Sequence, residues 1–245
     1  MIARPASVLP VIDPSFYDSW AIEKLKDPTR DLVLRWKALH LANLYIRQFP
    51  NSRPQSICEV GGAEGTVLAT VGEILFAPRL DCFEPSVEFC KAGQDRYPQI
   101  KFHQCEFDQS SPEYDMVILS DITEHVPDER DLLKTVAAKA RCVVLKMPIE
   151  VCLANSSFRY WLQGRDKPHQ LVFGKGHENG HLRGYSVRLA LQTVTQYFKV
   201  LNWYGLDPSF YFPGSTRVQA LRSLLGVTPM MWIFGGSLFV LGVRR

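Results

Sequence analysis

The chain has 245 residues, of which 46% are hydrophobic and 22% charged, enough to bury one sizeable core. The formal net charge of +3 is too small to favour a nucleic-acid partner. The longest apolar run, 230–243, is interrupted by glycines and is shorter than the ~20 residues of a membrane-spanning helix, so no membrane partner is expected.

Six cysteines show no C-x-x-C pairing, which favours buried thiols and a cytoplasmic location. Prolines interrupt residues 1–18, which we expect to be irregular and not a signal peptide. A helix is predicted from Pro28, because proline suits a first helical turn and leucines follow at helical spacing. Pro50 and Pro54 end it.

A short buried strand, residues 56–60, leads into a glycine-rich turn and the start of a helix. Gly61, Gly62 and Gly65 let a ligand approach the backbone closely. The helix that follows directs free N–H groups and a partial positive charge at an anionic group. A dinucleotide turn requires G-x-G-x-x-G, and Thr66 stands where its third glycine belongs.

The order Glu59-x-Gly61-x-Ala63-x-Gly65 resembles the first motif of class I S-adenosylmethionine (SAM) methyltransferases, E/D-x-G-x-G-x-G, with Ala63 replacing the middle glycine. The resemblance implies a Rossmann-like α/β fold with helices on both faces and a lid. Its mostly parallel sheet of seven strands has the order 3-2-1-4-5-7-6, with the last strand antiparallel. The resemblance also implies SAM as cofactor and S-adenosylhomocysteine (SAH) as product. The N-terminal helix would then cover the cofactor cleft or simply pack on the sheet edge.

A second strand, residues 79–84, ends in Glu84, about 20 residues beyond the glycine turn. A carboxylate at this place accepts both hydroxyls of a ribose diol. The alternative is an exposed charge at a strand end. Pro85 and Ser86 begin the next helix and belong to the predicted cofactor site.

A third strand is predicted over residues 100–104. In the family that the chain resembles, the segment after it offers an acid to the adenine amino group and an apolar residue to the ring. Glu106 with Phe107 fits this pattern, and Asp108 is an alternative acid.

A strongly apolar strand over residues 114–121 includes Ser120, another predicted cofactor contact. Together with Glu124 and His125 it resembles the family's fourth motif, fDxVxxxxxxEHv, and the resemblance covers roughly residues 55–147. A helix from Pro127 and a fifth strand follow. Three alternations of strand and helix imply parallel strands joined by right-handed crossovers.

From residue 148 to 185 the periodic pattern ends, and aromatic, basic and histidine residues gather. Such a long connection is usually a functional lid or a disordered segment, and the aromatics argue against disorder. A helix at 186–198 and strands at 200–204 and 239–243 follow. We therefore predict the following organisation: an N-terminal helical cap, 1–50, and a SAM-binding methyltransferase domain, 51–245, with a lid or substrate insertion at 148–185.

Three histidines are candidates for a catalytic base, because imidazole titrates near neutrality. His125 lies in the fourth motif, and His177 and His181 lie in the predicted lid. A structural hydrogen bond from a loop histidine is the alternative role. Four glycines in residues 174–184 argue against a helix that would pair His177 with His181 as metal ligands, and no metal site is predicted.

The sequence predicts a SAM-dependent methyltransferase that acts on O or N of a small molecule, such as a specialised metabolite or sugar-type intermediate, by in-line displacement. One alternative is methylation of a protein or RNA, although the chain has no basic stripe. The other is a SAM-binding subunit without turnover, which Ala63 in the turn leaves open, because fold similarity alone does not establish function.

Overall fold

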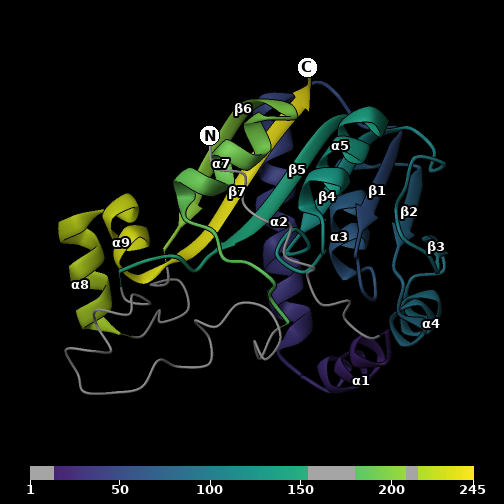
Figure 1. The fold of residues 1–245 in the computed structure, drawn as a ribbon, viewed down its shortest axis with the longest axis horizontal. Helices are drawn as coiled ribbons and strands as arrows, with labels where there is room; N and C mark the ends of the chain where they lie inside the picture. Colours follow the sequence, from purple (N-terminus) through teal and green to yellow (C-terminus); the bar gives the residue numbers. More distant parts are fainter. Residues whose placement is uncertain (1–13, 154–179, 208–214) are drawn as a thin grey trace, which may run out of the picture.

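The computed structural model describes residues 14–153, 180–207 and 215–245. Its centre is a seven-stranded sheet in the order β3-β2-β1-β4-β5-β7-β6 (Figure 1). β7 pairs antiparallel with β5 and β6, and the other neighbours are parallel. The predicted fold class, strand order and antiparallel last strand are confirmed. The strands are β1 (Ser56–Val60), β2 (Arg79–Phe83), β3 (Lys101–His103), β4 (Tyr114–Ser120), β5 (Ala140–Ile149), β6 (Phe198–Leu206) and β7 (Gly236–Arg244).

Helices cover both faces of this sheet. Among the described residues, none of these helices is both long and apolar enough to cross a membrane. The helices are α1 (Pro14–Leu25), α2 (Arg30–Gln48), α3 (Thr66–Leu75), α4 (Val87–Arg96), α5 (Glu129–Lys139), α7 (Val187–Thr195), α8 (Thr216–Leu225) and α9 (Val227–Phe234).

The side chains of the central strands alternate between two apolar cores. In β4, Met116 and Ile118 pack in the core formed with α2 and α3. Val117 and Leu119 point the other way and pack in the core with α5 and α7. All four are buried. Because successive strand residues face opposite sides, a strand buried on both faces has the continuous apolar sequence seen here.

The structure differs from the prediction at α1, at the end of β5 and at two further helices. Residues 14–18 were expected to be irregular, but α1 begins at Pro14, because proline is tolerated in a first helical turn. β5 continues to Ile149, inside the predicted lid, and it pairs with Gly236 of β7 there. α8 and α9 were not predicted. Ser215 caps α8, and glycines at 226 and 235 flank α9. Residues 154–179, most of the predicted lid, lie outside the described part of the chain.

Candidate active site

The predicted cofactor residues lie at the carboxyl ends of adjacent parallel strands. Gly61 follows β1, Glu84 follows β2, and Ser120 ends β4. Parallel strands bring their carboxyl ends to one edge of a sheet, so residues far apart in sequence meet there. This edge, next to the change in strand order, is where ligands bind in open α/β sheets.

The glycines of the turn cannot be replaced by larger residues without moving their neighbours. Gly61 has a φ of +64°, and a Cβ built on it would lie 2.5 Å from Cδ1 of Ile122. Gly62 has a less unusual backbone, but a Cβ there would lie 2.6 Å from Sγ of Cys82. Gly65 precedes the first residue of α3 with a φ of +77°. Larger side chains at these places would displace the packing around the turn.

Ala63, which stands at the family's middle glycine, has the left-handed φ of 48°. A side chain in this region costs roughly 1–2 kcal/mol, which a glycine would avoid. Its N–H donates to Oε2 of Glu84 at 2.9 Å, so the turn after β1 is hydrogen-bonded to the end of β2.

Glu84 is 8% exposed and accepts a second backbone hydrogen bond, from Ser86 N–H to Oε1 at 2.9 Å. Burial raises the pKa of this carboxyl, and the two backbone hydrogen bonds oppose the shift. Each carboxylate oxygen can accept more than one hydrogen bond. Glu84 is therefore held in place and keeps acceptor capacity for a ribose diol.

Ser86 joins α1 to this part of the edge. Its hydroxyl caps α4 and donates to Asp18 Oδ1 at 2.7 Å. Trp20 of α1 packs edge-on against Phe89 of α4, with ring centroids 5.9 Å apart. Pro85, between the two polar residues, is exposed. The N-terminal helix thus contacts the predicted cofactor residues directly.

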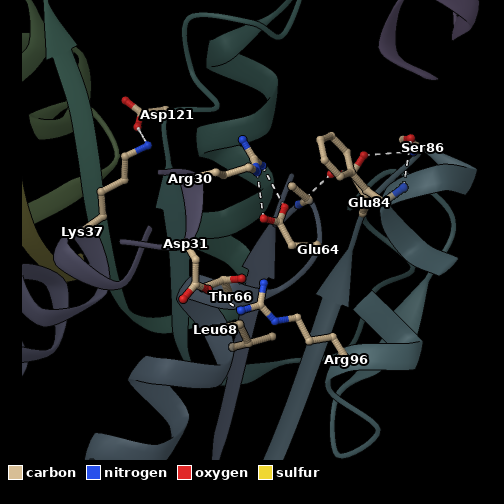
Figure 2. Close-up of polar contacts among 12 residues, drawn as sticks. Arg30, Asp31, Lys37, Glu64, Thr66, Leu68, Glu84, Ser86, Arg96 and Asp121 are labelled. Atoms are coloured by element: carbon tan, nitrogen blue, oxygen red, sulfur yellow. Dashed lines mark hydrogen bonds and ion pairs between the residues drawn. The ribbon is translucent and has the colours of Figure 1, made fainter. Parts of the chain in front are cut away.

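Two ion pairs join α2 to the same edge (Figure 2). Arg30 forms two parallel hydrogen bonds of 2.8 Å with Glu64, inside the glycine turn. Lys37 pairs with Asp121, directly after β4, at 2.8 Å. Lys146 of β5 also binds Asp121. Although burial alone would raise it, these two ammonium groups hold the pKa of Asp121 well below its usual range.

Glu59, the first acid of the motif, lies beneath the turn. Its side chain is buried, and Oε2 accepts the N–H of Leu68 in α3 at 3.0 Å. Burial raises the pKa of this carboxyl to about 8. In this structure the hydrogen bond from Leu68 to Glu59 joins β1 to α3 and so fixes the two ends of the glycine turn.

In the segment after β3, the two acids that could bind the adenine amino group differ in their contacts. Asp108 accepts hydrogen bonds from Ser110 in a local turn. Glu106 is exposed, and within the described ranges no residue engages its carboxylate. Phe107 is buried and packs edge-on against Phe83 with centroids 5.1 Å apart. Glu106 therefore remains the better candidate acid, while Phe107 is largely a core residue.

Two of the three predicted catalytic histidines lie together. The rings of His125 and His181 are 4.8 Å apart between centroids and nearly perpendicular. Nδ1 of His181 is 2.8 Å from Oε2 of Glu150, which follows β5. His177 lies outside the described residues.

Glu124, the residue before His125, is fully buried. Its Oε1 has no hydrogen-bond partner in the described part of the chain. Burial, together with the nearby charge of Asp121, raises the pKa of the Glu124 carboxyl to about 8. A buried polar atom without a partner is costly and points to a ligand that is bound in the working protein.

Several of these residues were not singled out from the sequence. Lys146 interrupts an otherwise apolar strand, a signal that was available. Arg30 and Lys37 lie on a helix surface rich in charges, and nothing in their spacing distinguishes them. Glu150 follows β5 at the boundary of the predicted lid and carried no signal.

Comparison with known proteins identifies the family of this chain. A family model described as a methyltransferase domain matches residues 33–178. The chain belongs to this family. The resemblance to class I SAM-dependent methyltransferases, and with it the enzyme class and SAM as cofactor, is thereby confirmed. No curated protein sequence matches this methyltransferase significantly.

Three solved structures illustrate the shared fold. Magnesium protoporphyrin IX methyltransferase from Synechocystis, solved with SAH, has a TM-score of 0.63 at 12% identity and covers 95% of this chain and 98% of its own. A putative methyltransferase in complex with the Trm112 activator, from Haloferax volcanii, has a TM-score of 0.61 at 13% identity and coverages of 96% and 100%. N-methyltransferase NodS from Bradyrhizobium japonicum, with SAH, has a TM-score of 0.55 at 12% identity and coverages of 93% and 92%.

The residues at the edge fit SAM. The bare turn admits a ligand to the backbone. The buried Oγ of Ser120 has no hydrogen-bond partner within the described residues, and Glu84 retains acceptor capacity.

We expect Ala63→Gly to maintain or raise stability. Relief of about 1–2 kcal/mol of left-handed strain exceeds the roughly 0.5–1 kcal/mol entropic cost of glycine. The matched control, Ala92→Gly in the right-handed helix α4, should lose about 1 kcal/mol. Urea unfolding measures both changes. A loss at position 63 equal to the control's would show that no strain is stored in the turn.

Arg30→Gln should lower the free energy of unfolding by about 1–3 kcal/mol, because Glu64, 3% exposed, loses its charged partner. SAH affinity should fall as well, because the glycine turn is released. The control Arg35→Gln removes an exposed pair with Asp31 and should cost at most about 0.5 kcal/mol. A double-mutant cycle with Glu64→Gln tests the pair, and a coupling energy near zero would refute this account of α2.

Proposed function

We propose that this methyltransferase transfers the methyl group of SAM to O or N of a small molecule at the carboxyl edge of the sheet. The observation that carries the proposal is the juxtaposition of a held carboxylate, Glu84, with the glycine turn through the 2.9 Å bond to Ala63. Beyond Asp121, the connection after β4 carries Glu124 and His125, and His181, from the segment before α7, lies next to them. One end of the edge suits the cofactor, and the other suits an acceptor.

The roles of the residues follow from this division. Glu84 accepts the ribose hydroxyls, Ser120 offers its hydroxyl to the methionine part, and Glu106 accepts from the adenine amino group. When bound, SAM supplies a methyl group that is already activated on a sulfonium. The protein therefore has mainly to align donor and acceptor and exclude water, which is worth up to ~7–11 kcal/mol of the barrier.

The N-terminal segment acts as a cap in this proposal. α1 bonds to Ser86 and packs on α4, and α2 bonds to the turn and to Asp121. Both helices would shield the cofactor from solvent, as the predicted organisation of residues 1–50 requires. Of the predicted lid or substrate insertion at 148–185, the described residues Glu150 and His181 would belong to the acceptor side.

An acceptor that arrives protonated must lose a proton. Of the predicted histidines, His181 is the better-positioned base, because Glu150 at Nδ1 orients the ring and assigns proton uptake to Nε2. His125 packs against it. His177 stays a prediction from the sequence.

The small-molecule class is supported by the net charge of +3 and by neighbours named for small substrates, such as magnesium protoporphyrin IX. The neighbour bound to the Trm112 activator gives a reason to test larger acceptors and a protein partner as well. A subunit without turnover is the remaining alternative.

Methyl-labelled SAM separates these functions. The protein is incubated with a cell extract fractionated into metabolites, RNA and protein, and the label is followed in each fraction. We expect transfer to the low-mass fraction. Label in protein or RNA would replace the proposed acceptor class, and label in no fraction, despite SAH binding, would favour a subunit without turnover.

Glu84→Gln should weaken SAH binding roughly tenfold to a hundredfold, because charged hydrogen bonds are worth about 1.5–3 kcal/mol. The NH₂ group of glutamine is a donor and cannot accept from one of the two backbone N–H groups that Glu84 binds. Circular dichroism must therefore first confirm that the variant folds. Glu73→Gln on the exposed side of α3 is the matched control and should leave affinity unchanged. Equal affinities in both variants, measured by calorimetry, would show that Glu84 is only a strand-end charge.

A further inference from the structure

Glu124, His125 and His181 bring three metal-ligating atoms together, although no metal site was expected from the sequence. Their carboxylate oxygen and imidazole nitrogens all lie within 4.8 Å of one another. A tetrahedral ion with bonds of 2.0–2.2 Å holds its ligand atoms about 3.4 Å apart. Small side-chain rotations would close this difference.

The carboxyl group of Glu124 is fully buried, and one of its two oxygens has no hydrogen-bond partner among the described residues. Glu124 is 0% exposed, and no described residue hydrogen-bonds to its Oε1. Oε2 accepts a long hydrogen bond, 3.4 Å, from the Thr123 hydroxyl, and the backbone N–H of Glu124 itself also bonds to the carboxylate. Burying a carboxylate oxygen without a partner costs free energy. A cation bound by this oxygen and by the two neighbouring imidazoles would supply the missing partner.

His181 has the support that metal-binding histidines usually have. Glu150 engages Nδ1 at 2.8 Å, which fixes the ring and assigns Nε2 as the ligand atom. A carboxylate behind a histidine in this way raises the basicity of the ligand and fixes its tautomer. Glu150 would therefore position His181 without touching the ion.

The segment that carries His181 is fastened to the β4 connection. The guanidinium of Arg183 donates to the carbonyl oxygens of Thr123, Val126 and Pro127 at 2.6–2.8 Å. Next to His181, Leu182 N–H donates to the carbonyl of Glu124 at 2.8 Å. The group is thus preorganised across 56 positions of sequence, from His125 to His181.

The two nearby ammonium groups are partly neutralised by Asp121. Lys146 and Lys37 both bind Asp121, which follows β4 three residues before Glu124. Their charge is partly compensated by that carboxylate, while Glu124 and Glu150 face the histidines.

We infer that Glu124, His125 and His181 form a site for one divalent first-row transition-metal ion of the Zn²⁺ type. Two imidazole nitrogens and one carboxylate oxygen suit such an ion, whereas Mg²⁺ and Ca²⁺ prefer oxygen ligands alone. Three protein ligands leave a coordination position open, as in catalytic zinc sites.

In methyl transfer, a role that rests on the proposed function, the open position would bind the acceptor's oxygen or nitrogen. A bound cation lowers the pKa of a coordinated hydroxyl. With the ion bound, Nε2 of His181 would be a ligand, so the base role proposed above would apply only to the metal-free protein, and the proton of the coordinated hydroxyl would pass to solvent.

The test uses the full chain after treatment with a chelator. Calorimetry with Zn²⁺ should show one equivalent bound to the wild type and to the control His40→Gln, which removes a partly buried histidine on α2 outside this group. Glu124→Gln, His125→Gln and His181→Gln should each weaken the affinity at least tenfold. Glu150→Gln should weaken it 10–100-fold without abolishing binding.

Co²⁺ provides a second readout. Its spectrum should show no thiolate charge-transfer band, which excludes binding to Cys105 or other free cysteines. If the buried Glu124 variant does not fold, the half-buried His125 variant decides the question. Absence of stoichiometric binding, or equal Zn²⁺ affinity in the ligand variants and the wild type, would overturn the inference.

SAH titrations with and without Zn²⁺ separate the two proposals. SAH binding without any Zn²⁺ binding removes the metal site and leaves the methyltransferase proposal standing. Zn²⁺ binding without SAH binding does the reverse.

Discussion

The hydrogen bonds that Glu84 accepts at the sheet edge join the parts on which the rest of the site depends. One carboxylate oxygen takes the N–H of Ala63 in the turn after β1, and the other takes the N–H of Ser86 at the start of α4. The turn, the second strand and the next helix are therefore fixed to one another. Because Glu84 is only 8% exposed, these hydrogen bonds compete with little water.

Ion pairs from α2 constrain the same edge of the sheet. Arg30 holds Glu64 of the turn, and Lys37 holds Asp121 after β4 (Figure 2). Lys146 in β5 reaches the same aspartate. α2 is thus joined by ion pairs to the segments that follow β1 and β4. α2 therefore packs on the sheet and also forms ion pairs with residues beside the predicted cofactor site.

The fold was predictable because its determinants are local or periodic. The apolar runs of β4 and β5, the glycines at 61 and 65 and the acid at 84 stand at separations that only a parallel α/β arrangement explains. α1 was missed because proline was taken as a break, although it also suits a helix start. α8 was missed because none of its residues is buried, so it leaves no apolar stripe.

The site was predictable only in part. Glu84, Ser120 and His125 follow strand ends or motifs that can be read from one sequence. The pairing of His125 with His181, and the approach of Glu150, depend on the path of the chain between β5 and α7, which no local pattern encodes. Ion pairs between residues far apart in the sequence, such as Arg30 with Glu64, likewise could not be predicted from a local pattern.

We propose that the glycine turn and Glu84 form a SAM site and not a dinucleotide site. Calorimetric titration of the wild-type chain with SAH and, separately, with NAD distinguishes the two kinds of site. We expect micromolar SAH affinity at one site per chain and no detectable heat with NAD. Micromolar NAD affinity with no SAH binding would contradict the account.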